Sequence, residues 1–371
     1  MAAIPEHGFL LIADLTGYTA YLSRGEIEHA PTIAGDLLET IVGRLEPPFR
    51  LAKFEGDAAF LYVEDGRAEG SLLLDAVEAA YLAFRRRLRS IEQASACDCT
   101  ACSQAPRLDL KFFLHHGEYV RTPIAGRDEL AGASIIVVHR LLKGATAAAA
   151  HDEDGRASGF GVVTAEALGA MAIDADALGA TAGSETIEHL GTVSTYTVDL
   201  EARWSSEAGR RRVEIDDQRA LVDISTVVPA DPATVWAYLT APALRPRWEG
   251  PIVIAETTED GRRGVGTRSQ CVTGRLATIE EIVDWQPYDH ASYRLVVPGV
   301  GAADATWDLA PDASGTTVRL RWAATGPDSP PVVELERVRR ERASALDRLT
   351  VVLGASPAGG ATDQELQEVP T

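Results

Sequence analysis

The sequence changes character at one polar, charged stretch, and that break does most to limit how the chain can fold. The stretch is SSEAGRRRVEIDD, residues 205–217, and five of the six tryptophans lie beyond it, in residues 220–330. At 371 residues the chain is also long enough for two hydrophobic cores. We therefore predict two domains, a linker and a disordered, Gly-, Pro- and acid-rich tail. Their bounds are 1–203 for the first domain, 204–217 for the linker, 218–355 for the second domain and 356–371 for the tail.

The composition limits the partners and the location that we expect for this protein. The formal net charge is −20, whereas a nucleic-acid-binding surface needs clustered lysine and arginine to neutralise phosphates. The same charge disfavours binding to an anionic membrane surface. No run of eighteen apolar residues is present, so we expect no membrane span. The N-terminal sequence MAAIPEHGFLLIADL has no basic region or cleavage site, which indicates no signal peptide and predicts a cytoplasmic protein.

The first half alternates strand and helix patterns. GFLLIAD is typical of a buried strand, and FRLAKFEG followed by AAFLYVED predicts a hairpin that turns at Gly56 and Asp57. Apolar residues recur on one face of two predicted helices, the first with Ile33, Leu37, Ile41 and Leu45, the second with Leu74, Val77, Tyr81, Phe84, Leu88 and Ile91. The strand LDLKFFLHHGEYV completes a β-α-β-β-α-β order, and residues 133–150 predict a further helix. GFGVVTAEAL and TIEHLGTVSTYTVDL then suggest a strand–helix pair and a closing hairpin.

The second half has a different pattern. ALVDISTVV predicts a strand, and PADPATVWAYL predicts a helix with Asp231 as its N-cap and Pro232 in its first turn. About six alternating strands follow, and the last element is a long helix. Its apolar stripe consists of Leu335, Val338, Ala345, Leu349 and Val352. We predict an antiparallel sheet curled around a terminal helix, and an α+β fold class for the whole chain.

Two aspartates of the first half end or follow predicted strands. Asp14 lies in IADLTGYT and Asp57 lies in KFEGDAAF. If the strands are neighbours, both carboxylates project over one edge of the sheet, where they suit Mg²⁺ or Mn²⁺, since hard cations prefer oxygen ligands. The turn after Asp14 contains Gly17, and its backbone N–H groups could face phosphate oxygens. The pattern predicts a two-metal site for phosphoryl transfer. On spacing alone, a helix cap at Asp14 and a plain turn at Asp57 explain the same residues.

Three of the four cysteines lie within CDCTAC, as Cys97, Cys99 and Cys102. A structural disulfide is unexpected in a cytoplasmic chain. Tetrahedral zinc needs four ligands, and His115 or the neighbouring His116 could supply the fourth. Free surface thiols, a redox-sensitive loop and a packed core histidine at His115 remain alternatives.

Four segments in this order, IADLTGYT, KFEGDA, LHHGEYV and GASIIVVHRLLK, make residues 8–200 resemble the class III nucleotidyl cyclase homology domain. Within that superfamily the sequence is most similar to an uncharacterised bacterial branch, marked by the HRLLK and cysteine segments. The resemblance implies a ferredoxin-like βαββαβ domain in which Asp14 and Asp57 hold two Mg²⁺ or Mn²⁺ ions. Lys53, four residues before the second acid, would contact the purine base of a nucleoside triphosphate. Arg140 would stabilise the transition state.

Two positions depart from the cyclase pattern. Ile136 stands where an asparagine orients the ribose, and Ala133 stands where an acid recognises the base. Loss of one oriented donor typically costs about 10²–10³ in rate. The resemblance therefore implies either a slow or atypical cyclase or a nucleotide-binding domain without turnover. Because related enzymes build each site across a head-to-tail dimer, a homodimer is also implied.

VPADPATVWAYLTAPALRPRWEG and IEEIVDWQPYDHASYRL make residues 218–354 resemble the START-like SRPBCC superfamily, also called polyketide cyclase/dehydrase-like. That resemblance implies a helix-grip fold, an antiparallel sheet around a long C-terminal helix, with a cavity for a small lipid, polyketide or aromatic molecule. Trp285, Tyr293 and Trp307 are the candidate lining residues; alternatively, these aromatic side chains fill the core. We identify no Ser-His-Asp set or carboxylate pair in this half.

Three functions follow from these patterns. The first is a signalling protein whose cyclase-like domain binds nucleotide and metal and whose START-like domain binds an apolar ligand. The second is a non-catalytic scaffold or ligand-binding protein, which Ile136 and Ala133 favour. The third is a polyketide cyclase-like enzyme acting in the second domain, and fold analogy alone does not establish that activity.

Overall fold

The structure is a computed structural model that describes residues 4–24, 29–94, 99–144, 147, 159–258, 261–325 and 331–355. It divides into an N-terminal unit, Met1–Arg211 with Glu259–Arg263, and a C-terminal unit, Arg212–Thr258 with Gly264–Thr371. Within the described ranges, none of the helices combines the length and apolar character that crossing a bilayer requires.

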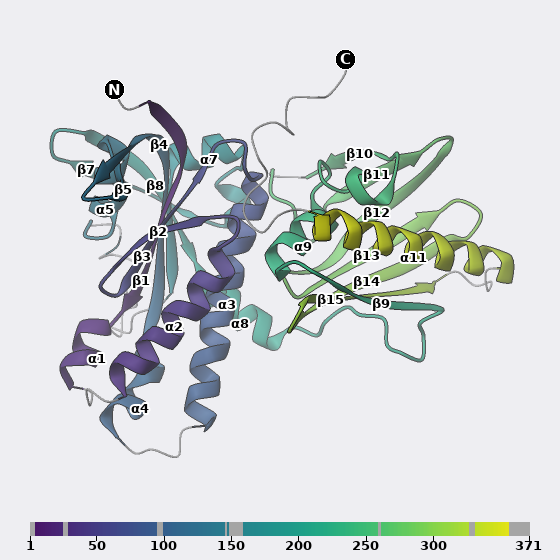
Figure 1. Cartoon of the computed structure of the whole chain (residues 1–371), viewed down its shortest axis with the longest axis horizontal. Coiled ribbons are helices and arrows are strands. Elements are labelled where there is room, and N and C mark those ends of the chain that lie inside the picture. Colours follow the sequence, from purple (N-terminus) through teal and green to yellow (C-terminus); the bar gives the residue numbers. More distant parts are fainter. Residues whose placement is uncertain are drawn as a thin grey trace. The chain divides into compact units, whose positions relative to one another are not determined.

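The N-terminal unit is built on one mixed sheet with the strand order β2-β3-β1-β4-β6-β8-β7, and β5 pairs with β4 (Figure 1). Neighbouring strands run antiparallel except β4 and β6, which are parallel. The strands are β1 (Pro5–Thr16), β2 (Arg50–Glu55), β3 (Ala58–Glu64), β4 (Asp109–Ile124), β5 (Arg127–Ala131), β6 (Phe160–Thr164), β7 (Thr181–Ile187) and β8 (Gly191–Asp199).

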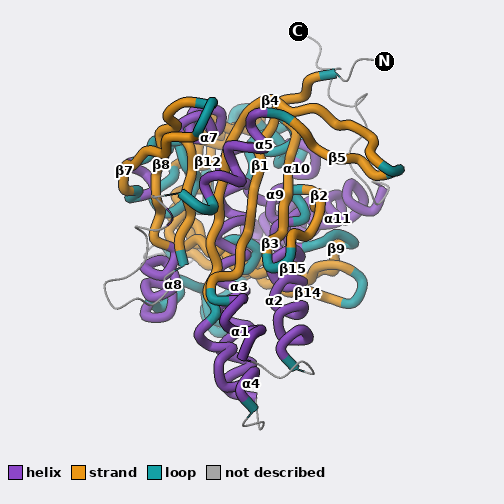
Figure 2. The backbone as a smooth tube through the Cα atoms, turned by 90° about the vertical axis from the view of Figure 1, so that its left-hand side faces the viewer, coloured by secondary structure: helices purple, strands orange, loops and turns teal. Residues whose placement is uncertain are grey.

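The longest helices of this unit, α2 and α3, run side by side along the sheet (Figure 1). The short helices α1 and α4 contact each other at one end of this pair, as Figure 2 also shows. The helices are α1 (Tyr18–Arg24), α2 (Ala30–Leu45), α3 (Gly70–Ala94), α4 (Thr100–Gln104), α5 (Ala133–Leu141), α7 (Ala165–Met171) and α8 (Leu200–Gly209).

Strand alternation decides which residues face helix α5. Successive side chains of a strand point to opposite faces, so Leu10, Ile12 and Asp14 of β1 share one face. Leu10 and Ile12 belong to a fully buried apolar cluster with residues of α5. Other members of that cluster are Phe60, Phe113, Val137, Val138 and Leu141. Asp14 therefore lies on the α5 face of the sheet, just beyond its apolar core.

The C-terminal unit is a seven-stranded antiparallel sheet with the order β10-β11-β12-β13-β14-β15-β9, and the long helix α11 lies along it (Figure 1). Val338, Leu346 and Leu349 lie on the buried side of α11. The strands are β9 (Val222–Val228), β10 (Val253–Thr257), β11 (Arg268–Thr273), β12 (Leu276–Gln286), β13 (His290–Val297), β14 (Gly301–Asp312) and β15 (Gly315–Ala324). The helices are α9 (Pro232–Thr240), α10 (Pro246–Glu249) and α11 (Val332–Ala355). The predicted α+β fold class is confirmed.

Local deviations from the predicted elements have physical causes. The helix predicted over residues 133–150 begins at Ala133, but α5 ends at Leu141, where Lys143 and Gly144 form a turn. Most of the alanine-rich remainder lies outside the described residues. Part of the stretch expected as linker, residues 204–209, belongs to α8, whose N-cap Asp199 accepts the backbone N–H of Ala202. The tail predicted over 356–371 also lies outside the described residues.

The N-cap of α9 gives a test of the fold of the C-terminal unit. The Asp231 carboxylate accepts hydrogen bonds from the backbone N–H and the hydroxyl of Thr234, both at 2.8 Å. Asp231→Ala is expected to lower the free energy of unfolding by about 1 kcal/mol in urea titrations, because one helix-end donor loses its acceptor. Asp347→Ala, an exposed position on α11, is the control and should change it by less than about 0.5 kcal/mol. Equal effects of the two substitutions would contradict the capping role.

Candidate functional site

The structure brings Asp14 and Asp57 together at the end of β1. Asp14 pairs with Ala58 of β3, the residue directly after Asp57. The backbone N–H of Leu15 donates to the carbonyl oxygen of Asp57 at 3.1 Å, which fastens the β2–β3 turn to β1. The two acids predicted from the sequence as metal ligands are therefore neighbours.

The environment of Asp14 is unusual for a carboxylate. Its side chain is only 13% exposed, and Lys111 of β4 lies opposite it, with Nζ 3.5 Å from Oδ2. Burial raises the pKa of Asp14 from 3.8 to about 6; Lys111 opposes that rise, and the charge of Asp57 adds to it. A divalent cation between the two acids would remove this cost, because it favours both ionised forms. No sequence pattern predicted this position for Lys111, which is one of only three lysines in the chain.

Lys53, the predicted base-contacting residue, lies on the same sheet face as Asp14. It pairs in register with Phe60 of β3, a member of the cluster under α5. Its Nζ lies 3.2 Å from a carboxylate oxygen of Glu55 and 3.1 Å from one of Glu129. Burial lowers the pKa of Lys53, but hydrogen bonds to Glu129 and Glu55 outweigh burial and raise it. Lys53 is thus a charged, half-exposed group positioned by two carboxylates.

Helix α5 carries the remaining residues that the sequence resemblance predicted for the site. His139 donates Nδ1–H to the carbonyl of Ile135 at 2.7 Å, and its Nε2 lies 2.9 Å from Glu55, which ties α5 to β2. Arg140 and Ile136, four residues apart, are both exposed. Within the described residues the side chain of Arg140 forms no hydrogen bond or ion pair. Its guanidinium is therefore available to a ligand or to a second copy of the chain.

Gly17 forms the turn between β1 and α1. Its φ of +86° lies in the left-handed region, where a side chain would be strained, so glycine is required for the turn. The carbonyl of Gly17 accepts the backbone N–H of Tyr21 at 2.9 Å. Because α1 has only seven residues, its helix dipole contributes little to anion binding at this turn.

An apolar pocket of the N-terminal unit does not include the acid pair. Its lining includes Leu74 and Val77 of α3 and Phe112 and Leu114 of β4. On β4 these two residues alternate with Lys111, so they face the opposite side of the sheet from Asp14.

The cysteine segment meets His29 and not His115. The Nδ1 atom of His29 lies 3.3 Å from Sγ of Cys99 and 3.7 Å from Sγ of Cys102. His115 points instead into the sheet core, where Nδ1 lies 3.0 Å from Thr164 Oγ1 and burial lowers its pKa to about 4. The expectation that His115 completes a zinc site is corrected, because β4 buries its ring. Cys97 lies outside the described residues.

Three aromatic residues predicted for the second domain share one face of its sheet. Trp285 of β12 and Trp307 of β14 both pair in register with Ala291 of β13. Tyr293, two residues after Ala291, points to the same side. Trp236 of α9 packs on Trp285, with ring centroids 4.6 Å apart. A small residue thus lies between two tryptophans beneath the helices of this unit.

A buried ion-pair network lies on the same face and was not predicted. Arg245, at the start of α10, donates to both carboxylate oxygens of Glu280 (2.7 and 3.2 Å) and to Glu249 (2.5 Å). Arg342 of α11 donates to the second oxygen of Glu249 at 3.3 Å. Burial raises the pKa of Glu280, but Arg245 outweighs this and lowers it. Because each charge meets an opposite charge, this network adds no net charge to the aromatic face.

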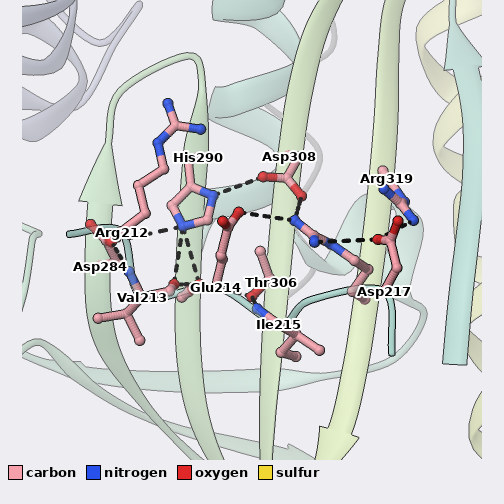
Figure 3. A network of polar contacts seen from close by, with 12 residues as sticks. Arg212, Val213, Glu214, Ile215, Asp217, Asp284, His290, Thr306, Asp308 and Arg319 are labelled. Atoms are coloured by element: carbon pink, nitrogen blue, oxygen red, sulfur yellow. Dashed lines mark hydrogen bonds and ion pairs between the residues drawn. The ribbon is translucent and has the colours of Figure 1, made fainter. Parts of the chain in front are cut away.

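Figure 3 shows a second polar network, which holds residues 212–217 against the sheet of the C-terminal unit. His290 donates or accepts at both ring nitrogens, with Nδ1 2.8 Å from Asp308 and Nε2 3.2 Å from Ser292 Oγ. These are the residue types of a Ser-His-Asp set, which the sequence analysis did not identify. However, Ser292 is 2% exposed and donates to the carbonyl of Val213 at 2.5 Å. The set therefore stabilises the covering segment and does not present a nucleophile.

Comparison with known proteins assigns the C-terminal region. Residues 219–354 match the family described as polyketide cyclase / dehydrase and lipid transport. The C-terminal unit therefore contains a polyketide cyclase/dehydrase-type domain. Its sheet and long last helix are the elements that carry the aromatic face and the Arg245 network.

The N-terminal region matches a family without an assigned activity. Residues 34–150 match a family described as a protein of unknown function, DUF2652. Over 107 residues the chain is 37% identical to the uncharacterized protein Rv2561/Rv2562 of Mycobacterium tuberculosis. The match covers 29% of this chain and 50% of that protein, so the chain spans about half the length of this curated relative.

Solved structures similar to parts of this chain share little sequence with it. The guanylyl cyclase Cya2 is 14% identical, and the match covers 53% of this chain and 94% of Cya2 with a TM-score of 0.39. A bacterial light-regulated adenylyl cyclase is 13% identical over 55% of this chain and 95% of its own, with a TM-score of 0.39. DynU16, a putative protein of the dynemicin biosynthetic locus, is 24% identical over 36% of this chain and 47% of its own, with a TM-score of 0.31.

The raised pKa of Asp14 predicts a specific dependence on pH. Its folded-state pKa, about 6, lies above its usual 3.8, so the folded state holds this proton to higher pH than the unfolded state. The contribution of Asp14 to the free energy of unfolding therefore falls as pH rises from about 4 to about 6, by at most about 3 kcal/mol. We expect the side-chain carboxyl carbon of Asp14 to titrate near pH 6 in NMR spectra, with its resonance assigned by its loss in Asp14→Asn.

Addition of Mg²⁺ should move this titration to lower pH, because the cation favours the carboxylate. The exposed Asp174 serves as the control, and Mg²⁺ should leave its carboxyl resonance unchanged. A midpoint near 4 for Asp14 without metal would contradict the burial argument, and an unmoved midpoint would contradict metal binding there.

Proposed function

We propose that the N-terminal unit binds a nucleoside triphosphate through a divalent cation held by Asp14 and Asp57, and cyclises it slowly. The observation that carries the proposal is the acid pair itself. A buried carboxylate beside a second acid destabilises the fold when both are ionised, and one lysine compensates only part of that charge. Such a cost is typical of groups kept for binding or catalysis.

Groups around the pair suit the other parts of a nucleotide. Lys53 lies on the same sheet face and can exchange a carboxylate partner for an acceptor on the base. The Gly17 turn places backbone groups directly after β1, beside Asp14. Arg140 has no partner within the described residues, and in a homodimer it would act on the nucleotide held by the other copy.

Binding without turnover is the second candidate, and Ile136 favours it. Its apolar side chain is 51% exposed on the same helix as Arg140, where it cannot hydrogen-bond a ribose. The loss of such an oriented donor costs about 10²–10³ in rate, which leaves affinity for triphosphate and metal in place.

We predict that purified protein with Mn²⁺ converts at least one of ATP, GTP, CTP and UTP to its cyclic monophosphate with release of inorganic pyrophosphate, as read by mass spectrometry. Asp57→Ala should abolish the product and weaken nucleotide binding at least about tenfold, because the cation loses a ligand. Arg140→Ala should lower turnover by about 10² or more and change nucleotide affinity little, because it acts on the transition state.

Lys143→Ala, at an exposed lysine just after α5, is the matched control and should leave both quantities unchanged. Nucleotide binding without product, lost in Asp57→Ala, would favour the second candidate. Wild-type protein that neither binds nor converts any of the four nucleotides would overturn both.

We further propose that the polyketide cyclase/dehydrase-type domain binds a small, uncharged apolar ligand on its aromatic face. The row of Trp285, Ala291 and Trp307 supports this, because a small residue between two large ones leaves aromatic surface around it. The paired charges of the Arg245 network favour an uncharged ligand. The covered Ser-His-Asp set does not support chemistry in this domain.

We expect the fluorescent probe 8-anilinonaphthalene-1-sulfonate to bind this domain through the contact of its apolar rings with the aromatic face. Trp307 is half-buried, so Trp307→Leu should weaken binding about tenfold with the fold intact, since it removes aromatic contact area. Trp204→Leu, in the N-terminal unit, is the matched control. Equal affinities in wild type and Trp307→Leu would contradict the proposed ligand face.

A further inference from the structure

We propose that His29, Cys99 and Cys102 form a metal site for zinc, separate from the acid pair. The three residues come from two segments of the N-terminal unit. His29 directly precedes α2. Seventy residues later in the chain, Cys99 is the N-cap of α4 and Cys102 lies within that helix. One potential ligand atom from each lies within 4.8 Å of the other two.

The separations fit tetrahedral zinc. With zinc–sulfur bonds of about 2.3 Å and zinc–nitrogen bonds of about 2.05 Å, a tetrahedral angle places sulfur and nitrogen about 3.6 Å apart. The observed separations from His29 Nδ1 are 3.3 Å to Cys99 Sγ and 3.7 Å to Cys102 Sγ. A cation can therefore enter among the three atoms with shifts of a few tenths of an ångström. Three protein ligands leave one tetrahedral position for a fourth ligand.

The local backbone already suits a thiolate at Cys99. The backbone N–H of Cys102 donates to Cys99 Sγ at 3.4 Å, an outer hydrogen bond of the kind that orients metal ligands. Neither cysteine is in a disulfide, and both are half-buried. The His29 side chain makes no capping hydrogen bond to α2 and is exposed.

Ligand chemistry separates this site from the acid pair. Two sulfurs and one imidazole select zinc over Mg²⁺ or Mn²⁺, whereas two carboxylates select the hard cations. Cys271 is not part of the site: it lies on β11 of the C-terminal unit, where burial raises its pKa to about 12.

A bound zinc ion would join the start of α2 to α4. Helix α2 packs on α3, and α4 contacts α1, which follows the Gly17 turn. The ion would thus fix the chain between Asp14 and α2, so its loss should lower the melting temperature of the N-terminal unit.

The test uses the full chain, purified under reducing conditions without chelator, and measures bound metal by mass spectrometry. We expect one zinc per chain, and after exchange with Co²⁺ we expect the absorption bands of tetrahedral thiolate-bound cobalt. X-ray absorption at the zinc edge should show at least two sulfur neighbours and one imidazole. His29→Ala and Cys102→Ser should each weaken zinc binding at least about 100-fold, since even outer-shell partners typically contribute 10–100-fold.

His189→Ala, at an 88% exposed histidine, and Cys271→Ala are the matched controls and should keep full zinc affinity. Asp57→Ala should also keep it, which distinguishes this site from the nucleotide site. A reduced, folded wild type that binds no zinc would overturn the proposal. Zinc binding that His29→Ala leaves unchanged would overturn it as well, as would an absorption spectrum with only nitrogen and oxygen neighbours.

Discussion

The register of β1 between β3 and β4 is the constraint on which the N-terminal unit depends. It places Asp14 opposite Lys111 on one side and next to the β2–β3 turn with Asp57 on the other. A shift of one residue would move Asp14 to the α2 and α3 face and leave Lys111 beside an apolar residue. The packing resists that shift, because Leu10 and Ile12 fill the α5 face while Leu11 and Ala13 fill the other face, and the shift would bury Asp14 away from Lys111. The hydrophobic core and the acid pair are thus specified together.

Two proposed cation sites lie at and beyond the end of this strand. The first is the acid pair, and the second is the set of His29, Cys99 and Cys102 just beyond α1 and at α4. The first site offers hard carboxylate oxygens, whose negative charge Lys111 partly compensates. The second offers two soft sulfur ligands and one imidazole. This difference in ligand type would let one unit hold the proposed hard cation and the proposed zinc ion at separate sites.

The C-terminal unit uses its buried polar groups in two ways. On one face, Arg245 and Arg342 neutralise Glu249 and Glu280 beside a row of aromatic residues. In the other network, the carbonyl oxygen of Val213 accepts from Ser292 and lies 3.2 Å from His290 Nε2, which holds the segment that begins the unit. Both networks are costly to bury, and their hydrogen bonds to neighbouring charges or carbonyl groups favour one arrangement of the chain.

The sequence by itself determined the elements whose signals are local. Apolar periodicity located β1, α2, α3 and α11, the Gly56–Asp57 turn located the hairpin, and Asp231 marked the start of α9. Tertiary structure alone decided which distant residues meet. His29 replaces His115 at the cysteines, Lys111 lies against Asp14, and His290 lies between Ser292 and Asp308. Strand register and helix packing create these contacts, and they depend on all the residues of both elements, so no spacing within one segment could reveal them.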